Sequence, residues 1–342
     1  MQITDGVWGV AARIPGQLRT VNCYLIKDGD DAYMVDTTWS KETSMRVVHY
    51  KMDDDTMELV LGLMDEAGVA PRDIKGIVVT HAHPDHMGLL TELQELTGAP
   101  ALMHSGELLE NAVLVQNDEF WTEVRRDWFR TNGFPDDMDQ VLSFLTPEYM
   151  PIPIDRVHTV CDGDIIPIGS MRWQVVWTPG HSLGQICFYE RERGIIMTGD
   201  HVLPHDTPIV MCHAALDGIH HNPLGNYINS LEKLLDLPVE MALPGHGQIM
   251  YNFHEIVEKD LKHHVVRIDD VINGIKNGAR TGLEVACQVP WIGRKKQYME
   301  LGQLDRWMAF AETMAHLREL EARGVIKSQY DHSVKKLHWS LV

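Results

Sequence analysis

Four side chains that can bind a metal ion fall within six consecutive residues of the sequence. They are His81, His83, Asp85 and His86. The segment directly follows residues 77–80, an apolar run that is typical of a buried strand. A buried cluster of imidazoles and a carboxylate needs a cation to satisfy its polar atoms, and zinc, iron and manganese accept these ligands. The segment therefore predicts a metal centre at the end of a strand rather than a polar loop.

Three further candidate ligands each follow an apolar run later in the chain. The runs and the candidates after them are 171–177 with His181, 194–198 with Asp200, and 239–243 with His246. A single His or Asp beside a glycine is more often a turn residue. The ordered set of four motifs, HxHxDH and then GH, GD and GH, is the signal that favours a common metal centre.

This ordered set resembles the metal-binding motifs of the metallo-β-lactamase superfamily. It is similar to the hydrolase branch that contains type II glyoxalases and related thioesterases and lactonases, and the resemblance covers residues from about 20 to 250. The resemblance implies two metal ions with a shared ligand. The first metal would be held by His81, His83 and His181. The second would be held by Asp85, His86 and His246, with Asp200 bridging the two.

The chemistry of such a site follows from the metals. Two divalent cations about 3.5–4 Å apart can share a hydroxide, because coordination lowers the pKa of water to about 7. One cation can also polarise the carbonyl oxygen of a substrate. Asp85 would lie beside the hydroxide, so we expect it to act as the catalytic residue that orients the hydroxide or moves its proton. Zinc is our first expectation, and iron or manganese are alternatives because the ligand set contains no thiolate.

These motifs predict a dinuclear metal-dependent hydrolase in which a metal-bridging hydroxide attacks an ester-like carbonyl. An acyl thioester is the first candidate substrate. A lactonase would use the same hydroxide, and a two-metal site also suits a phosphodiesterase or endoribonuclease. An iron-dependent oxygenase is a further alternative, although a mononuclear oxygenase would keep fewer ligands than this chain offers.

Strands and helices alternate over the first 257 residues, which predicts an α/β fold. Apolar patterns indicate strands within 7–38, at 76–80, at 99–104 and between 157 and 198, and helices at 56–68, 87–96 and 227–237. The resemblance implies, more specifically, an αββα metallo-β-lactamase sandwich. It also implies that Asp36, at a strand end, lies behind the metal site and orients a ligand through a hydrogen bond.

One segment of the expected catalytic domain, residues 1–257, is an insert relative to a minimal hydrolase. It runs over 106–151 and contains aromatic residues at helical spacing between 119 and 130. Such a helix either packs into a core or forms a lid over the substrate pocket. Trp121 and Trp128 are therefore candidate substrate contacts. Two others, His221 and Asn222, lie in the loop that follows Asp200.

Residues 258–342 form a second expected domain. The patterns predict three helices followed by a hairpin, which is the order of a winged helix and resembles the small domain appended to some metallo-β-lactamase-fold proteins. The region carries 14 Lys and Arg against 11 Asp and Glu. This weak positive balance favours packing, homodimer formation or shaping of the pocket over contact with nucleic acid.

Composition limits the partners and the cellular compartment that we expect for this protein. The formal net charge of −19 disfavours binding to nucleic acid or anionic membranes. The sequence has no apolar run of membrane-spanning length and no secretory signal at its N-terminus. Its five cysteines are scattered without a CxxC pair, which fits a reducing compartment. We therefore expect a cytoplasmic enzyme that acts on a small-molecule acyl substrate, with neither membrane nor nucleic acid as a partner.

Overall fold

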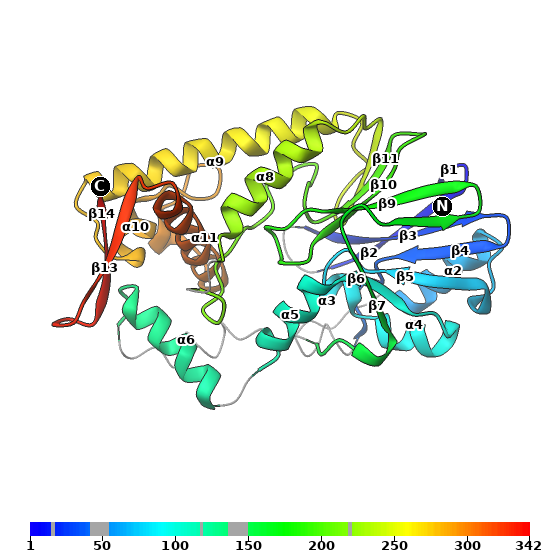
Figure 1. The fold of residues 1–342 in the computed structure, drawn as a ribbon, viewed down its shortest axis with the longest axis horizontal. Coiled ribbons are helices and arrows are strands. Elements are labelled where there is room, and N and C mark those ends of the chain that lie inside the picture. Colours follow the sequence, from blue (N-terminus) through cyan, green and yellow to red (C-terminus); the bar gives the residue numbers. More distant parts are fainter. Residues whose placement is uncertain (15–17, 42–54, 117–118, 136–149, 218–220) are drawn as a thin grey trace. The chain divides into compact units, whose positions relative to one another are not determined.

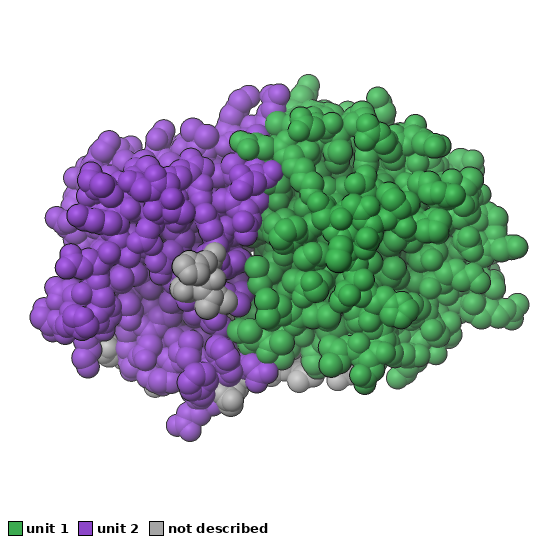
Figure 2. Space-filling view, viewed as in Figure 1, with its two compact units in different colours: residues 1–115, 148–208, 230–257 green, residues 116–147, 209–229, 258–342 purple. Residues whose placement is uncertain are grey.

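The computed structural model describes residues 1–14, 18–41, 55–116, 119–135, 150–217 and 221–342. The chain divides into two compact units (Figure 2). The first unit consists of residues 1–115, 148–208 and 230–257, and the second unit consists of residues 116–147, 209–229 and 258–342. The predicted boundary at 257/258 is also a boundary between the units. The segments 116–147 and 209–229, which the sequence placed in the catalytic domain, belong to the second unit.

The first unit is built on two β-sheets (Figure 1). A seven-stranded sheet has the order β1 (Gln2–Thr4), β2 (Val7–Arg13), β3 (Thr20–Asp28), β4 (Asp31–Val35), β5 (Ile74–Val78), β6 (Ala101–His104) and β7 (Val157–Val160). Strands β1 to β4 pair antiparallel, and β4 to β7 pair parallel. A five-stranded sheet has the order β12 (Met241–Pro244), β11 (Ile195–Gly199), β10 (Ile186–Glu190), β9 (Met171–Trp177) and β8 (Ile165–Ile168).

Alternating side chains of β3 show how the layers pack, because successive residues of a strand point to opposite faces. Tyr24 and Ile26 join a buried cluster with residues of the five-stranded sheet. Cys23 and Leu25 join a second buried cluster with residues of α2 (Thr56–Glu66) and α4 (Leu90–Thr97). The expected α/β architecture is therefore confirmed, with the second sheet on one face of the first and helices on the other.

Four other helices of the first unit connect its strands in the described part of the chain. They are η1 (Pro71–Asp73), α3 (Pro84–Met87), α5 (Ser105–Leu114) and η2 (Ile154–Arg156). The single helix expected at 87–96 is instead divided between α3 and α4. A Cβ on Gly88 would lie 2.8 Å from both Ser40 N and Thr38 O. The chain between the two helices therefore passes against neighbouring backbone, which leaves no room for a larger residue.

The three helices and the hairpin expected in the C-terminal region correspond to α9 (Phe253–Lys276), α10 (Gly282–Gln288), α11 (Gln303–Ala322) and the strands β13 (Ile326–Asp331) and β14 (Lys336–Leu341), and the winged-helix assignment stays a prediction. The second unit also contains α6 (Glu119–Thr131) and η3 (Tyr298–Glu300). Helices α8 (Pro223–Leu235) and α9 each have residues in both units. Thr281 and Glu284 form a capping box at the start of α10.

Helix α6 packs into the second unit. The rings of Trp128 and Phe129 lie 5.0 and 5.5 Å from that of Phe310 on α11, and Lys336 Nζ donates to the carbonyl oxygens of Arg130 and Phe134. These contacts match the core-packing interpretation of the aromatic helix, and the lid remains a prediction. Within the described ranges, no helix has both the length and the apolar character needed to cross a membrane.

Candidate metal centre

The seven predicted ligands all lie in the first unit, in loops that follow β5, β9, β11 and β12. Backbone hydrogen bonds join these loops across the two sheets. Ile186 N donates to Thr80 O at 3.0 Å, Gly245 N donates to Gly199 O at 2.7 Å, and Asn22 N donates to Gly245 O at 2.7 Å. The motifs are far apart in sequence, but the sheets bring their loops to one place.

Three histidines form the first group of side chains that could hold a metal ion: His81, His83 and His181. The Nδ1 atom of His83 lies 3.0 Å from the Nε2 atoms of both other rings. His81 is fully buried. The three nitrogens therefore converge on one point, which is the arrangement that a tetrahedral metal requires of its protein ligands.

A second group consists of Asp85, His86 and His246. Asp85 Oδ2 lies 3.3 Å from His246 Nε2, and the Nε2 atoms of His86 and His246 are 3.3 Å apart. Both histidines are buried, whereas the side chain of Asp85 keeps 16% of its surface exposed. Asp85 is thus the member of this group that a substrate or water can approach.

Asp200 lies between the two groups. Its Oδ2 atom is 3.1 Å from His246 Nε2 and 3.8 Å from His181 Nε2, and its Oδ1 atom is 3.3 Å from His86 Nε2. One carboxylate therefore reaches nitrogens of both groups. This is the position that a bridging ligand would need.

The outer nitrogens of three histidines are held by neighbouring groups. His86 Nδ1 lies 2.8 Å from Asp36 Oδ2, His246 Nδ1 lies 2.6 Å from Thr20 O, and His81 Nδ1 lies 3.1 Å from Thr80 Oγ1. Such partners fix the orientation of each ring and leave Nε2 for a metal. The sequence singled out Asp36 for this task, but it gave no sign of the roles of Thr20 and Thr80.

Asp36 also accepts hydrogen bonds from Thr80, which directly precedes the metal motif. Thr80 N donates to its Oδ1 atom and Thr80 Oγ1 donates to its Oδ2 atom, each at 2.8 Å. Its backbone has a φ of 58°, a conformation that is uncommon for residues other than glycine and enriched in Asp and Asn. This strained backbone turns the carboxylate toward the metal motif.

The electrostatics of the cluster favour a positive charge at its centre. Burial acts to lower the pKa of His246, but Asp200 and Asp85 outweigh it and raise the pKa to about 10. Burial acts to raise the pKa of Asp85, but His86 and His246 hold it at about 2. Ionised carboxylates that attract protons onto buried imidazoles would attract a divalent cation in the same way. The residues therefore fit a metal centre with nitrogen and oxygen ligands.

The four predicted substrate contacts lie in the second unit. Trp128 Nε1 donates to Asp217 Oδ2 at 2.6 Å, and Asn222 Nδ2 donates to Glu319 Oε2 at 2.5 Å. Trp121 and His221 are partly exposed. The side chains of Trp128 and Asn222 thus have bonding partners inside their own unit, and substrate contact by all four remains a prediction.

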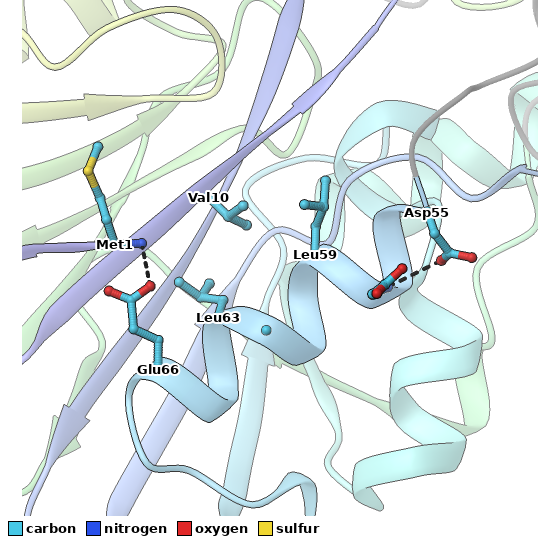
Figure 3. A pocket seen from close by; sticks show the side chains of 8 residues that line it. Met1, Val10, Asp55, Leu59, Leu63 and Glu66 are labelled. Carbon is cyan, nitrogen blue, oxygen red and sulfur yellow. Dashed lines mark hydrogen bonds and ion pairs between the residues drawn. The ribbon is translucent and has the colours of Figure 1, made fainter.

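A pocket that the sequence did not reveal adjoins the metal motifs. It has a volume of about 470 Å³, and its lining includes Leu18, Arg19, Leu203, Pro204 and His246. A second hollow of about 490 Å³ lies against α2 and β2, between Val10, Leu59 and Leu63 (Figure 3). The second hollow contains none of the predicted ligands, whereas the lining of the first includes His246.

Comparisons with known proteins agree with this geometry. The family model described as "Metallo-beta-lactamase superfamily" matches residues 16–246. The probable metallo-hydrolase YqjP of Bacillus subtilis is 24% identical over 334 residues, which cover 96% of each chain. The acyl-coenzyme A thioesterase MBLAC2 of Gallus gallus is 27% identical over 186 residues, which cover 52% of this chain and 58% of that protein.

Solved structures show the same fold over the whole chain. The metallo-beta-lactamase family protein TTHA1429 from Thermus thermophilus has a TM-score of 0.73 and 26% identity, covering 99% of this chain and 100% of that one. A beta-lactamase domain protein from Burkholderia ambifaria has a TM-score of 0.76 and 20% identity, covering 100% of this chain and 93% of that one. Together with the converging histidines and aspartates, these matches show that the chain belongs to the metallo-beta-lactamase superfamily of metal-dependent hydrolases.

Proposed function

We propose that this chain is a dinuclear metal-dependent hydrolase of acyl thioesters. The three-histidine group would hold one metal, the group of Asp85, His86 and His246 would hold the other, and Asp200 would bridge them. Zinc is the metal that we propose first. The observation that carries the substrate proposal is the pocket of about 470 Å³ whose lining includes His246.

The shape and lining of this pocket suit an acyl thioester. Leu18, Leu203 and Pro204 form an apolar wall on which an acyl chain can be buried. The exposed Arg19 stands at the same pocket with a backbone φ of 62°. This cation would attract the anionic part of a leaving group such as coenzyme A, although the exposed Asp206, which lines the same pocket, offsets part of its charge. The likeness to a protein named as an acyl-coenzyme A thioesterase supports the same choice.

The residues of the centre have distinct tasks in this reaction. Two divalent cations, when bound, would supply an activated water and a Lewis acid for the carbonyl oxygen. Asp85 is ionised at neutral pH, because its pKa is held at about 2, so it can accept a hydrogen bond from the attacking water and hold its proton. The water oxygen bonds to the acyl carbon, the carbon–sulfur bond breaks, and the thiol leaves with a proton.

The proposal is tested by release of free thiol from metal-loaded protein. Acyl-coenzyme A and acyl-glutathione thioesters of increasing chain length are compared with a lactone and with bis-p-nitrophenyl phosphate, and metal content is measured by elemental analysis. We expect about two metal ions per chain and thioester turnover that is abolished in His81→Ala. Turnover of the lactone or the phosphodiester without any thioester cleavage would refute the substrate class, and a single iron ion without hydrolysis would refute the hydrolase.

A further inference from the structure

Glu107 is a buried carboxylate that contacts two of the loops of the metal centre. It lies in the first turn of α5 and exposes 2% of its surface. Its Oε2 atom accepts a hydrogen bond from Ala82 N at 2.6 Å. Its Oε1 atom accepts from Gly184 N at 2.8 Å and from Ser182 Oγ at 2.5 Å. Both oxygens are therefore used, and each serves a different loop.

The two loops are those that carry the three-histidine group. Ala82 stands between His81 and His83, and Ser182 directly follows His181. The hydrogen bonds of Glu107 in the described part of the chain go to Ala82, Ser182 and Gly184, which are next to or near the three histidines, and none goes to Asp85, His86 or His246. A single side chain thus joins the backbones that set the positions of three histidines on loops far apart in sequence.

Close packing holds α5 against the second of these loops. A Cβ on Gly106 would lie 2.7 Å from Leu183 O, and a Cβ on Gly184 would lie 2.3 Å from Glu107 N and 2.8 Å from Glu107 Cγ. Only glycine allows the two backbones to approach this closely at both positions. The start of the helix is therefore fitted to the loop, and a shift of Glu107 would be transmitted to residues 182–184.

The carboxylate is chemically suited to this position. It accepts from three donors, whereas an amide of the same shape would present an NH₂ group to at least one of them. Glutamine at position 107 would therefore keep the size of the side chain but leave a buried N–H group facing another donor, which costs about 1–3 kcal/mol in general.

We propose that Glu107 is a positioning residue that ties the His81–His83 loop to the His181 loop and thereby sets the metal affinity of the three-histidine group. The inference rests on the dinuclear centre of the proposed function, but it does not depend on the substrate. Removal of the carboxylate should weaken the first metal more than the second, because the rings of His86 and His246 are held by Asp36 and Thr20.

Glu110 provides a matched control. It lies one turn further along α5, exposes 5% of its surface and accepts a hydrogen bond from Leu183 N at 2.6 Å. It is thus a buried glutamate of the same helix, and this hydrogen bond goes to the His181 loop. Any loss that arises from general disturbance of α5 should appear in Glu110→Gln as well as in Glu107→Gln.

The experiment measures zinc affinity by competition with a chromophoric chelator in four proteins: wild type, Glu107→Gln, Glu110→Gln and Ser182→Ala. We expect Glu107→Gln to weaken one of the two zinc ions by about 10- to 100-fold, the range typical of groups that orient metal ligands. Ser182→Ala removes one of the three hydrogen bonds and should have a smaller effect in the same direction. Thermal unfolding of the metal-free proteins shows whether each variant is folded.

Two further backgrounds identify the affected metal. In His246→Ala, which keeps the three-histidine group, adding Glu107→Gln should weaken the remaining zinc. In His181→Ala, which breaks that group, it should not. Equal weakening of both zinc ions, unchanged affinity, or an equal effect of Glu110→Gln would each overturn the inference. If Glu107→Gln does not fold, Ser182→Ala is measured in its place. Unchanged zinc affinity in Ser182→Ala would then overturn the inference. Failure of thioester turnover with selective zinc loss would refute only the proposed substrate.

Discussion

Buried histidines form two clusters in this protein, one in each unit, and only one of them is arranged for a metal. In the first unit, imidazole nitrogens converge with the carboxylates of Asp85 and Asp200. In the second unit, His264 and His316 are equally buried, and the Nδ1 atom of the first lies 3.3 Å from the Nε2 atom of the second. Among the described residues, no third ligand atom completes a metal group with these two histidines.

Burial lowers the pKa of histidines in both clusters, and the pKa of His83 in the metal centre is about 3. Burial likewise lowers the pKa of His316 to about 3, although its hydrogen bond with Glu312 O acts in the opposite direction. In the metal centre the carboxylates outweigh burial and raise the pKa of His246 to about 10. A buried histidine alone is therefore a neutral core residue, and the carboxylates around it decide whether the site favours a cation.

The largest effect is expected from removing the charge between the two metal groups. Asp200→Asn keeps the shape of the side chain but removes the carboxylate that reaches His86, His181 and His246. We expect loss of at least one metal ion and a fall in kcat of about 10³-fold or more, because metal-based stabilisation of the transition state is worth several kcal/mol. Elemental analysis and thioester turnover measure the two effects. Asp30→Asn, on an exposed turn, should change neither.

A smaller effect is expected from Asp36→Asn, because Asp36 contacts the Nδ1 atom of His86 and leaves the Nε2 atom for the metal. Asparagine tolerates the positive φ of this position, so the variant tests the hydrogen bonds to His86 and Thr80 rather than the backbone. We expect metal affinity to fall by about 10- to 100-fold. Chelator competition measures the affinity, and unfolding of the metal-free protein checks the fold. Wild-type affinity in a folded variant would show that the orienting bond has no role in metal binding.

The contrast between the clusters also explains what the sequence could predict. Each candidate ligand lies within a few residues of the end of an apolar run, so residue type and strand pattern indicated the candidates and the α/β fold, and the family resemblance implied how the candidates divide between two metals. The histidines of the second unit lie on helical faces and carry no such pattern. Glu107 stands in an ordinary helix, and its partners Ala82 and Gly184 are distant in sequence. Local sequence patterns do not predict these contacts, because the contacts form only when the sheets bring the segments together.

The division into units was predictable only in part, for the same reason. The boundary near residue 257 follows a change from strands to helices, which sequence patterns report. The assignment of α6 to the second unit depends on Trp128 and Phe129 meeting Phe310, a contact between residues far apart in sequence. The sequence of an amphipathic helix shows which of its faces is apolar, but it does not show which part of the protein this face packs against.

The smallest effect is expected from His316→Gln and concerns stability rather than metal binding. The pKa of His316 is about 3 in the folded protein, against 6.5 for an unperturbed histidine. Below pH 6.5 the unfolded chain therefore binds a proton that the folded protein rejects, and the stability present above pH 6.5 is lost as the pH falls toward 3. Between pH 6.5 and 5 this loss amounts to at most about 2 kcal/mol.

The glutamine variant removes this titration, so its stability should fall less steeply with acid than that of the wild type, while its metal content should be unchanged. Urea unfolding at pH 7.5, 6.5, 5.5 and 5.0 compares the two proteins, and the histidines of the metal centre contribute equally to both. Parallel pH profiles would show that His316 is protonated in the folded chain. The second cluster would then resemble the first in attracting a cation, and the distinction between them would have to rest on the converging carboxylates alone.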